Sequence, residues 1–393
     1  MFRRITSIVL LSTFTLLPMS TVNAQESVKA HHDGHKFRNP WPSFIPFGFG
    51  SVIKLLATTD IRNTTKRITA QDRTKKVEMN WNLIKQQEQL DNITVTWLGH
   101  ACIFLQMKGF NIIFDPIFSD RCAPFQFIGP KRFTEPPCAL TDLPKIDAVI
   151  ISHNHYDHMD ANTISQIDQH SPDCKFYVPL GNKNWFKLSN QLDSQGHERV
   201  IELDWWDTDI LKKSGATLRF TCTPAQHQSG RTLFDKDKTL WSSWCIEGLD
   251  KNENPTEGRI FFGGDTGYRA IPANTKPEDE YNYEYLDTLP HCPAFKEIGE
   301  KVGPFDLALI PIGAYSPRWF MSAVHCSPED AVDLHKDINS KHSIGIHWGT
   351  FVLTDEPVHD PPKRLEAALR QRKIDTKEFH VLPLGGSYTV SIK

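Results

Sequence analysis

The sequence predicts a mixed α and β protein, of the α+β or α/β class, in which two mixed β-sheets pack together and helices cover their outer faces. Short apolar runs bounded by turn residues recur between Ile93 and Leu382, and such runs are typical of buried strands. Helix-like segments follow strands late in each half of this region. The chain has 393 residues and 39% hydrophobic content, which suffices for a large core in one big domain or two.

Residues 1–24 predict a secretory signal peptide. Arg3 and Arg4 precede an apolar run from Ile8 to Leu17, and Val22-Asn23-Ala24 offers a small-residue cleavage site. The apolar run is short for a membrane span, and an uncleaved anchor is the alternative. We therefore expect an exported protein, periplasmic or secreted. Its eight cysteines have irregular spacing, so an oxidising compartment permits disulfides but no pairing is assigned.

Residues 25–92 predict an N-terminal arm with a possible role at a membrane. The tract His31-His32-Asp33-Gly34-His35 has metal-binding composition, but its position near the mature terminus favours a solvated segment. The aromatic, Pro- and Gly-rich run at 41–50 either packs along the core or dips into a lipid interface. Packing is favoured because Lys54 is the only nearby cation. Residues 60–90 are charged and partly helical.

Residues 93–393 predict the catalytic domain. A helix is expected from Ala161, and two more over 326–338 and 361–371, the first with a start signal in Ser327-Pro328-Glu329-Asp330. The strands are expected at 94–98, 102–106, 111–114, 148–152, 176–179, 200–204, 217–223, 240–247, 260–262, 307–311, 343–347 and 379–383. The net charge of −3 gives no basic footprint for nucleic acid.

A cluster of metal-type side chains follows the strand expected at 148–152. The stretch Ser152-His153-Asn154-His155-Tyr156-Asp157-His158 places three histidines and one aspartate at the carboxyl end of that strand. A turning loop can aim His153 and His155 at one metal, and Asp157 and His158 at a neighbouring one. Imidazole with carboxylate suits zinc, with iron or manganese as second choices.

Three later strands end in side chains of the same kind. His227, Asp265 and His347 each follow an expected strand, and a two-metal site needs about seven protein ligands. Any one of them alone is more often an ordinary core histidine or a turn aspartate. Three in this order, after the motif at 152–158, indicate a two-metal site.

With these residues in place, the sequence resembles the metallo-β-lactamase fold, an αββα sandwich. More narrowly, it resembles the N-acyl-phosphatidylethanolamine-hydrolysing phospholipase D family from about Thr94 to Leu382. Many of the shared motifs hold no metal-type residue, and they therefore separate this family from the fold at large. The motifs are Trp97-Leu98-Gly99-His100-Ala101, Asp115-Pro116-Ile117-Phe118-Ser119, Gly129-Pro130-Lys131-Arg132-Phe133, Glu202-Leu203-Asp204-Trp205-Trp206, Phe262-Gly263-Gly264-Asp265-Thr266-Gly267-Tyr268, Pro311-Ile312-Gly313-Ala314-Tyr315, Pro317-Arg318-Trp319-Phe320-Met321 and Ile346-His347-Trp348-Gly349-Thr350-Phe351.

The resemblance implies two zinc ions, the second of which iron or manganese could replace. One zinc is expected on His153, His155 and His227, and the other on Asp157, His158 and His347, with Asp265 as the bridge between them. Asp157, Asp265 and His325 are the expected catalytic residues. His325 would serve the substrate phosphate or proton transfer, just before a helix start whose N–H groups favour an anion. Tyr156, Arg231 and His325 are the expected substrate contacts.

The activity implied is zinc-dependent phosphodiester hydrolysis of the phospholipase D type. N-acyl-phosphatidylethanolamine would yield N-acylethanolamine and phosphatidic acid through a metal-bound hydroxide, at a membrane surface and in a homodimer. One alternative is a metallo-hydrolase of the same fold acting on another phosphodiester, a lactone or a β-lactam. Another is a non-catalytic binding protein that keeps the fold.

The sequence departs from the family pattern around the expected site. Gly230 stands where a lysine is usual, and Val324 stands where a glutamine is usual. An acidic, Tyr-rich insertion at about 269–291 follows Asp265, where it could act as a lid or reshape the mouth of the site. Trp205-Trp206 and Trp319-Phe320-Met321 are candidate lining for an acyl groove, or simply core.

Overall fold

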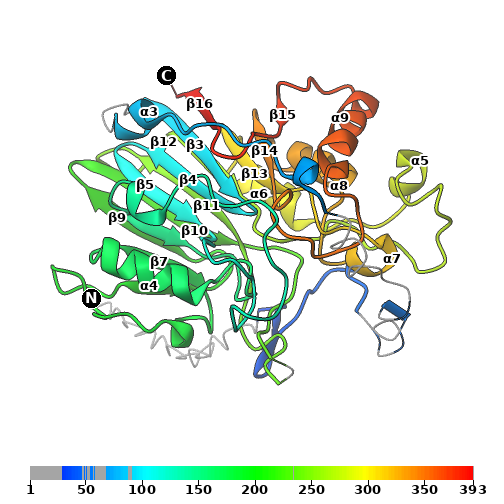
Figure 1. Ribbon diagram of the computed structural model, residues 1–393, viewed down its shortest axis with the longest axis horizontal. Coiled ribbons are helices and arrows are strands. Elements are labelled where there is room, and N and C mark those ends of the chain that lie inside the picture. Colours follow the sequence, from blue (N-terminus) through cyan, green and yellow to red (C-terminus); the bar gives the residue numbers. More distant parts are fainter. Residues whose placement is uncertain are drawn as a thin grey trace, which may run out of the picture.

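Two seven-stranded mixed sheets form the centre of the computed structural model (Figure 1). The structure describes residues 29–46, 68–86, 91–232 and 234–392, with a few isolated positions between 48 and 57. The predicted signal peptide lies outside these ranges. Within them, no helix has the length and apolar character needed to span a bilayer.

Each sheet combines antiparallel and parallel pairs. The first has the order β16-β3-β4-β5-β6-β7-β8 and the second the order β15-β14-β13-β12-β11-β10-β9. In the first sheet the strands are β3 (Asn92–Gly99), β4 (Cys102–Met107), β5 (Phe110–Phe114), β6 (Ala148–Ile150), β7 (Lys175–Pro179), β8 (Val200–Leu203) and β16 (Ser387–Ser391). In the second they are β9 (Thr208–Lys213), β10 (Ala216–Thr223), β11 (Ser243–Leu249), β12 (Pro255–Phe262), β13 (Leu307–Pro311), β14 (Ser343–Ile346) and β15 (Phe379–His380).

Helices lie outside the sheets. Helix α4 lies beside β7, whereas α8 and α9 lie beside β13 and β15 on the other side of the molecule (Figure 1). The α-helices are α3 (Trp81–Lys85), α4 (Ala161–His170), α5 (Tyr283–Leu286), α6 (Ala294–Lys301), α7 (Arg318–Met321), α8 (Pro328–Asp337) and α9 (Asp360–Arg372). Single turns of 3-10 helix lie at Ala70–Asp72, Leu140–Asp142 and Lys183–Trp185.

The core follows from the two-residue period of the strands. In β3, Val95 and Trp97 face the second sheet, whereas Leu98 faces the layer that holds α4. Phe114 and Phe262 meet between the sheets with ring centroids 4.6 Å apart. Both faces of the inner strands are thus buried, which explains their near-continuous apolar sequences.

The predicted sandwich is confirmed, and most expected elements lie within a few residues of their observed bounds. Strand β11 begins at Ser243 rather than Leu240, and β15 ends at His380 rather than 383. Strands β9 and β16 were not anticipated. Strand β9 turns into β10 through Ser214 and Gly215, both with positive φ, a tight hairpin of the kind that glycine favours.

The N-terminal arm packs on the domain, and the prediction of a solvated tract at 31–35 is wrong for His31 but holds for the exposed residues 33–35. Strands β1 (His32–Asp33) and β2 (Lys36–Phe37) form a small hairpin, and His31 is buried. Trp41 stacks on Trp205 with ring centroids 5.4 Å apart, so the favoured interpretation, packing along the core, holds there. Further along the run, Phe44 packs against Ala270, Ala323 and Val324, whereas Phe47 and Phe49 lie outside the described residues.

Candidate metal centre

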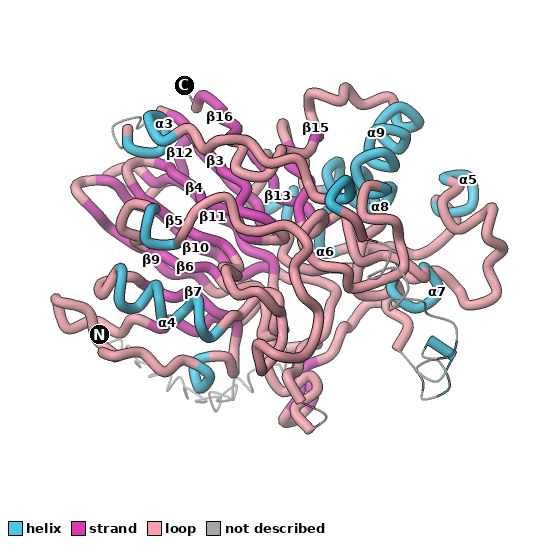
Figure 2. Tube along the Cα trace, in the orientation of Figure 1, coloured by secondary structure: helices cyan, strands magenta, loops and turns pink. Residues whose placement is uncertain are grey.

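The predicted metal residues lie at the carboxyl ends of strands from both sheets. The motif at 152–158 follows β6 of the first sheet, whereas His227, Asp265 and His347 follow β10, β12 and β14 of the second. Long loops gather at these strand ends, in the lower middle of the view in Figure 2. The structure brings together all seven side chains that the sequence predicts as ligands.

One group comprises His153, His155 and His227. Their ring nitrogens lie within 4.8 Å of one another. His153 Nε2 is 2.7 Å from His155 Nδ1, and His227 Nε2 is 3.3 Å from the same atom. All three imidazoles therefore aim nitrogen atoms at a common point, as ligands of one ion would.

A second group comprises Asp157, His158 and His347, joined by His100. His158 Nε2 is 3.2 Å from His347 Nε2, which is 3.6 Å from Asp157 Oδ2. His100 Nε2 lies 3.0 Å from that same oxygen. The sequence assigned His100 no role, although the structure places it against a predicted ligand.

Asp265 lies between the two groups. Its Oδ1 is 3.0 Å from His347 Nε2, and its Oδ2 is 3.0 Å from His158 Nε2 and 3.7 Å from His227 Nε2. The side chain is buried. A carboxylate in this position can bridge two cations.

The outer hydrogen bonds of the histidines show that these residues fit a metal. His227 Nδ1 donates to the carbonyl of Val324 at 2.8 Å, and His158 Nδ1 donates to Asp115 at 2.6 Å. In a neutral imidazole this leaves the Nε2 lone pair, directed at the centre, without a proton. The buried Oδ1 of Asp265 has no hydrogen-bond partner. Imidazole lone pairs that converge beside a buried carboxylate are the donor set of a cation site.

The electrostatics of the centre also favour a cation. Burial and the neighbouring imidazoles of His158, His155 and His227 hold the pKa of His153 well below its ordinary value, so that ring is neutral. Burial also opposes a charge on His158. The carboxylates of Asp265, Asp157 and Asp115 outweigh it and hold the pKa of His158 well above its ordinary value. The three carboxylates thus favour a positive charge at the second group.

Sequence reasoning missed the residues that hold the ligands in place, Asp115 and His100. Asp115 accepts hydrogen bonds from Ser152 N at 2.7 Å, from Ser152 Oγ at 2.6 Å and from His158 Nδ1. His100, Asp115 and His347 all have positive φ, at 53°, 36° and 62°. Such backbone is strained for residues other than glycine and gathers at functional sites. A polar residue directly after a strand, as Asp115 is after β5, was the available signal.

Replacing Asp115 by asparagine is expected to weaken zinc binding about 10- to 100-fold, because a support of a ligand histidine is lost. Either orientation of the amide sets its NH₂ group against a donor: against Ser152 N if the oxygen takes the place of Oδ2, or against His158 Nδ1 and Ser152 Oγ if the oxygen takes the place of Oδ1. Competition with a chelating dye measures the change in affinity. Asp120→Asn, on the same loop but exposed, is the matched control, and equal affinity in the two variants would refute the role of Asp115.

His325 lies beside the centre, on the segment between α7 and α8. Its Nδ1 is 3.9 Å from Asp265 Oδ2 and has no hydrogen-bond partner, so it is available to a substrate. The start of α8 is less available than expected. Ser327 and Asp330 cap each other's N–H groups there, so those two donors are already used.

Arg231 supports the metal loop from outside. Its Nη1 donates to the carbonyls of Asn154 at 2.9 Å and Met159 at 2.8 Å. Its guanidinium lies 4.0 Å from the centroid of the Tyr156 ring, and the Tyr156 hydroxyl donates to the Arg231 carbonyl. This geometry makes Arg231 and Tyr156 a clamp on the loop. Direct contact with substrate stays a prediction for both.

The insertion at 269–291 is fastened to the helices beside it. Arg372 of α9 pairs with Asp287, and its guanidinium lies 3.7 Å from the centroid of the Tyr283 ring. The Tyr283 hydroxyl donates to the carbonyl of Glu329 at 3.0 Å. These contacts anchor the insertion on α8 and α9.

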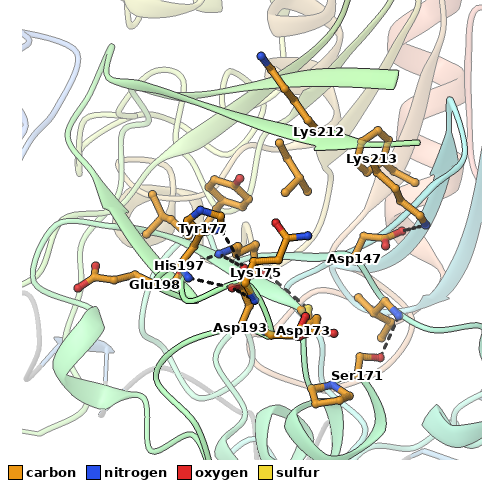
Figure 3. A pocket seen from close by; sticks show the side chains of 18 of the residues that line it. Asp147, Ser171, Asp173, Lys175, Tyr177, Asp193, His197, Glu198, Lys212 and Lys213 are labelled. Atoms are coloured by element: carbon orange, nitrogen blue, oxygen red, sulfur yellow. Dashed lines mark hydrogen bonds and ion pairs between the residues drawn. The ribbon is translucent and has the colours of Figure 1, made fainter. Parts of the chain in front are cut away.

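A sizeable cavity lies away from this centre. It has a volume of about 830 Å³ and is bordered by β7, β8 and β9. Figure 3 shows charged side chains along it, with Lys175 paired to Asp193 and Lys213 paired to Asp147. None of the predicted site residues lines it. Because charged side chains line this cavity, it does not suit an acyl chain.

Comparison with known proteins agrees with this geometry. The model of the beta-lactamase superfamily domain matches residues 110–281 and 285–348. The chain is 36% identical, over 358 residues, to N-acyl-phosphatidylethanolamine-hydrolyzing phospholipase D 1 of Caenorhabditis elegans, covering 89% of this chain and 91% of that protein. The chain belongs to the N-acyl-phosphatidylethanolamine-hydrolysing phospholipase D family.

A second relative named for the same activity is the mitochondrial N-acyl-phosphatidylethanolamine-hydrolyzing phospholipase D of Saccharomyces cerevisiae. It is 35% identical over 273 residues, 69% of this chain and 50% of that protein. Among solved structures, the isothiocyanate hydrolase from Delia radicum gut bacteria has a TM-score of 0.51 at 17% identity, covering 76% of this chain and all of that one. This likeness supports the fold alone. Membership of the N-acyl-phosphatidylethanolamine-hydrolysing phospholipase D family makes the chain a metal-dependent hydrolase.

Proposed function

We propose that this protein hydrolyses N-acyl-phosphatidylethanolamine to N-acylethanolamine and phosphatidic acid. The observation that carries the proposal is the complete set of seven metal-type side chains, brought together from both sheets. It occurs in a chain that matches a relative named for this activity over 89% of its length. In the reaction, water adds to phosphorus, the P–O bond to the ethanolamine oxygen breaks, and that oxygen takes a proton.

We further propose two zinc ions, held as the sequence predicts. His153, His155 and His227 would hold one, and Asp157, His158 and His347 the other, with Asp265 between them. Zinc bound there would supply a Lewis acid that activates water near neutral pH and neutralises phosphate charge. Iron or manganese could replace the second zinc.

Asp157 and His325 would have different roles in the reaction, one toward the attacking water and the other toward the phosphate or the leaving group. The Asp157 side chain is 15% exposed against 2% for Asp265, so Asp157 is the carboxylate that can exchange protons with solvent. It would accept the proton of the attacking water, while His100 holds its Oδ2 in place. His325, with its free Nδ1, would contact a phosphate oxygen or return a proton to the leaving alkoxide.

A zinc-loaded preparation of the chain in mixed micelles tests this proposal. Mass spectrometry should detect both N-acylethanolamine and phosphatidic acid. Removing the metals with a chelator should abolish release, and added zinc should restore it. If the loaded protein leaves this lipid intact but opens a lactone or a β-lactam, the substrate assignment is wrong while the metal chemistry stands. Absence of bound zinc, iron or manganese would contradict the whole proposal.

Peripheral association with a membrane fits a lipid substrate. Two loops that leave the sheets near the metal ligands expose large apolar side chains. Phe127 and Ile128, after β5, are 79% and 61% exposed, and Phe234, after His227, is 84% exposed. Exposed apolar groups of this size are typical of lipid or protein contacts. We also propose export through the predicted signal peptide, and a homodimer that sedimentation can test.

Replacing Phe127 by serine is expected to reduce cosedimentation with phospholipid vesicles and to slow hydrolysis in vesicles. Hydrolysis of lipid in detergent micelles should change little, because the loop carries no metal ligand. Leu192→Ser, at another exposed apolar residue, is the control. Equal vesicle binding by both variants would argue against this loop as the membrane contact.

A further inference from the structure

A separate cluster of metal-type side chains joins the N-terminal arm to the domain. His31 Nε2 lies 2.7 Å from Asp204 Oδ1, and His32 Nε2 lies 2.9 Å from Asp204 Oδ2. The three ligand atoms are all within 4.8 Å of one another. Asp204 follows β8, which ends at Leu203, so the cluster joins residues more than 170 positions apart in sequence.

The cluster is held in place by its surroundings. His31 and Asp204 are only 5% and 6% exposed. The His31 ring stacks on Trp205 with centroids 4.1 Å apart. Backbone pairing of His32 with Phe37, across a turn at Gly34 with φ of 62°, fixes the arm side of the cluster. Both imidazoles thus present Nε2 to one carboxylate with little freedom to turn away.

The distances from histidine to carboxylate are similar to the one in the metal centre. They are 2.7 and 2.9 Å here, against 3.0 Å from His158 Nε2 to Asp265. Two imidazoles and a carboxylate are donors that zinc prefers, and structural zinc takes four ligands. Asp207 can be the fourth, because it lies beside the cluster with its Oδ1 3.5 Å from Lys29 Nζ.

In the structure, the Lys29 ammonium group supplies the positive charge beside Asp204. Its Nζ is 2.9 Å from Asp204 Oδ2 and 3.3 Å from the Trp205 carbonyl. The Lys29 and Asp207 side chains are 45% and 51% exposed, so the lysine can move into solvent. Asp207 Oδ2 accepts from Asp204 N at 3.1 Å, which leaves its Oδ1, now 3.5 Å from Lys29 Nζ, as the oxygen that could take the place of the lysine. Two neutral imidazoles with two carboxylates then balance the charge of a divalent cation.

We propose that His31, His32 and Asp204, with Asp207, form a third metal site that binds a zinc-class divalent cation in competition with the Lys29 ammonium. The ion would be structural, since it would clamp the arm to the end of β8. The arm in turn reaches the metal centre. Asn39 donates to the His227 carbonyl at 2.7 Å and accepts from His227 N at 3.1 Å. Ser43 donates to the Gln226 amide oxygen.

Zinc content after loading and desalting tests this site. The wild-type chain should hold one more zinc ion than His32→Ala, whose partly exposed side chain should be tolerated. His35→Ala, exposed in the same tract, should match the wild type. Lys29→Gln should bind the extra ion more tightly, because the competing charge is gone. The same difference of one ion should persist in an Asp265→Asn background, which separates this site from the metal centre.

A second measurement follows the arm itself. Zinc should slow tryptic cleavage after Lys36 and Arg38 in the wild type but not in His32→Ala. Equal zinc content in the wild type and His32→Ala, or weaker binding in Lys29→Gln, would overturn the proposal. Either result would mean that the cluster is a network of ion pairs and hydrogen bonds. Melting curves verify that each variant is folded.

Discussion

Asp265→Asn should lower phosphodiester hydrolysis on the order of 10³-fold or more, the scale expected when a shared member of a metal and catalytic set is lost. Asp265 lies between both histidine groups, with oxygens 3.0 Å from His158 Nε2 and from His347 Nε2. An asparagine there keeps one oxygen but turns the other ligand atom into an N–H₂ group. It also removes the negative charge that offsets two cations. We expect reduced zinc content together with the loss of rate.

The matched control is Asp91→Asn, at an exposed aspartate outside the site. Rates come from N-acylethanolamine release, zinc content from elemental analysis, and folding from melting curves. A folded Asp265→Asn protein with full zinc content and nearly normal activity would remove Asp265 from both the metal-binding and the catalytic role.

Asp168→Ala is expected to destabilise the fold by roughly 3–5 kcal/mol, the usual cost of leaving a buried charge without its partner. Arg199 is fully buried, and its Nη1 lies 2.6 Å from Asp168 Oδ1. Arg199 also donates to the carbonyls of Cys174 and Asn190, but Asp168 is its only carboxylate partner among the described residues. Chemical denaturation gives the free energy of unfolding, with exposed Asp91→Ala as the control.

The pH dependence gives a second check on the same ion pair. Burial raises the pKa of Asp168, but hydrogen bonds from Ser189 and Arg199 outweigh burial and hold it below its ordinary value. The carboxylate therefore stabilises the fold above its unfolded pKa, near 4, and this contribution is lost as the pH falls through the folded pKa. The stability gap between wild type and Asp168→Ala should narrow in acid. A gap that is constant with pH would indicate lost packing instead.

The sequence was sufficient to predict the sandwich and the gathering of the seven candidate ligands, because both depend on local patterns. Four of these residues lie in the loop after β6, and His227, Asp265 and His347 follow strands of the second sheet. Histidine and aspartate in such positions are informative even before the fold is known. His100 also follows a strand, but a single histidine after Gly99 looks like any turn residue, so its contact with Asp157 was hidden.

What could not be predicted depends on distant partners. His31 seemed solvated because it lies near the expected mature terminus, whereas its actual partner, Asp204, is 173 residues away. Strand β16 is a short run at the end of the chain that gains its place only by pairing with β3. Strand β9 carries two lysines at its end and lies at the sheet edge, where lysine is tolerated but the hydrophobic signal is weak.

The way the two sheets share the metal centre has a consequence for how the chain folds. Each group takes two ligands from the loop after β6 and one histidine from the second sheet, His227 in one group and His347 in the other. Neither of these two groups can form from one half of the chain alone. Coordination at either group would therefore require docked halves, and an ion bound there would act as a reversible crosslink between them. Removal of bound metal should weaken the contact between the two sheets before either sheet unfolds.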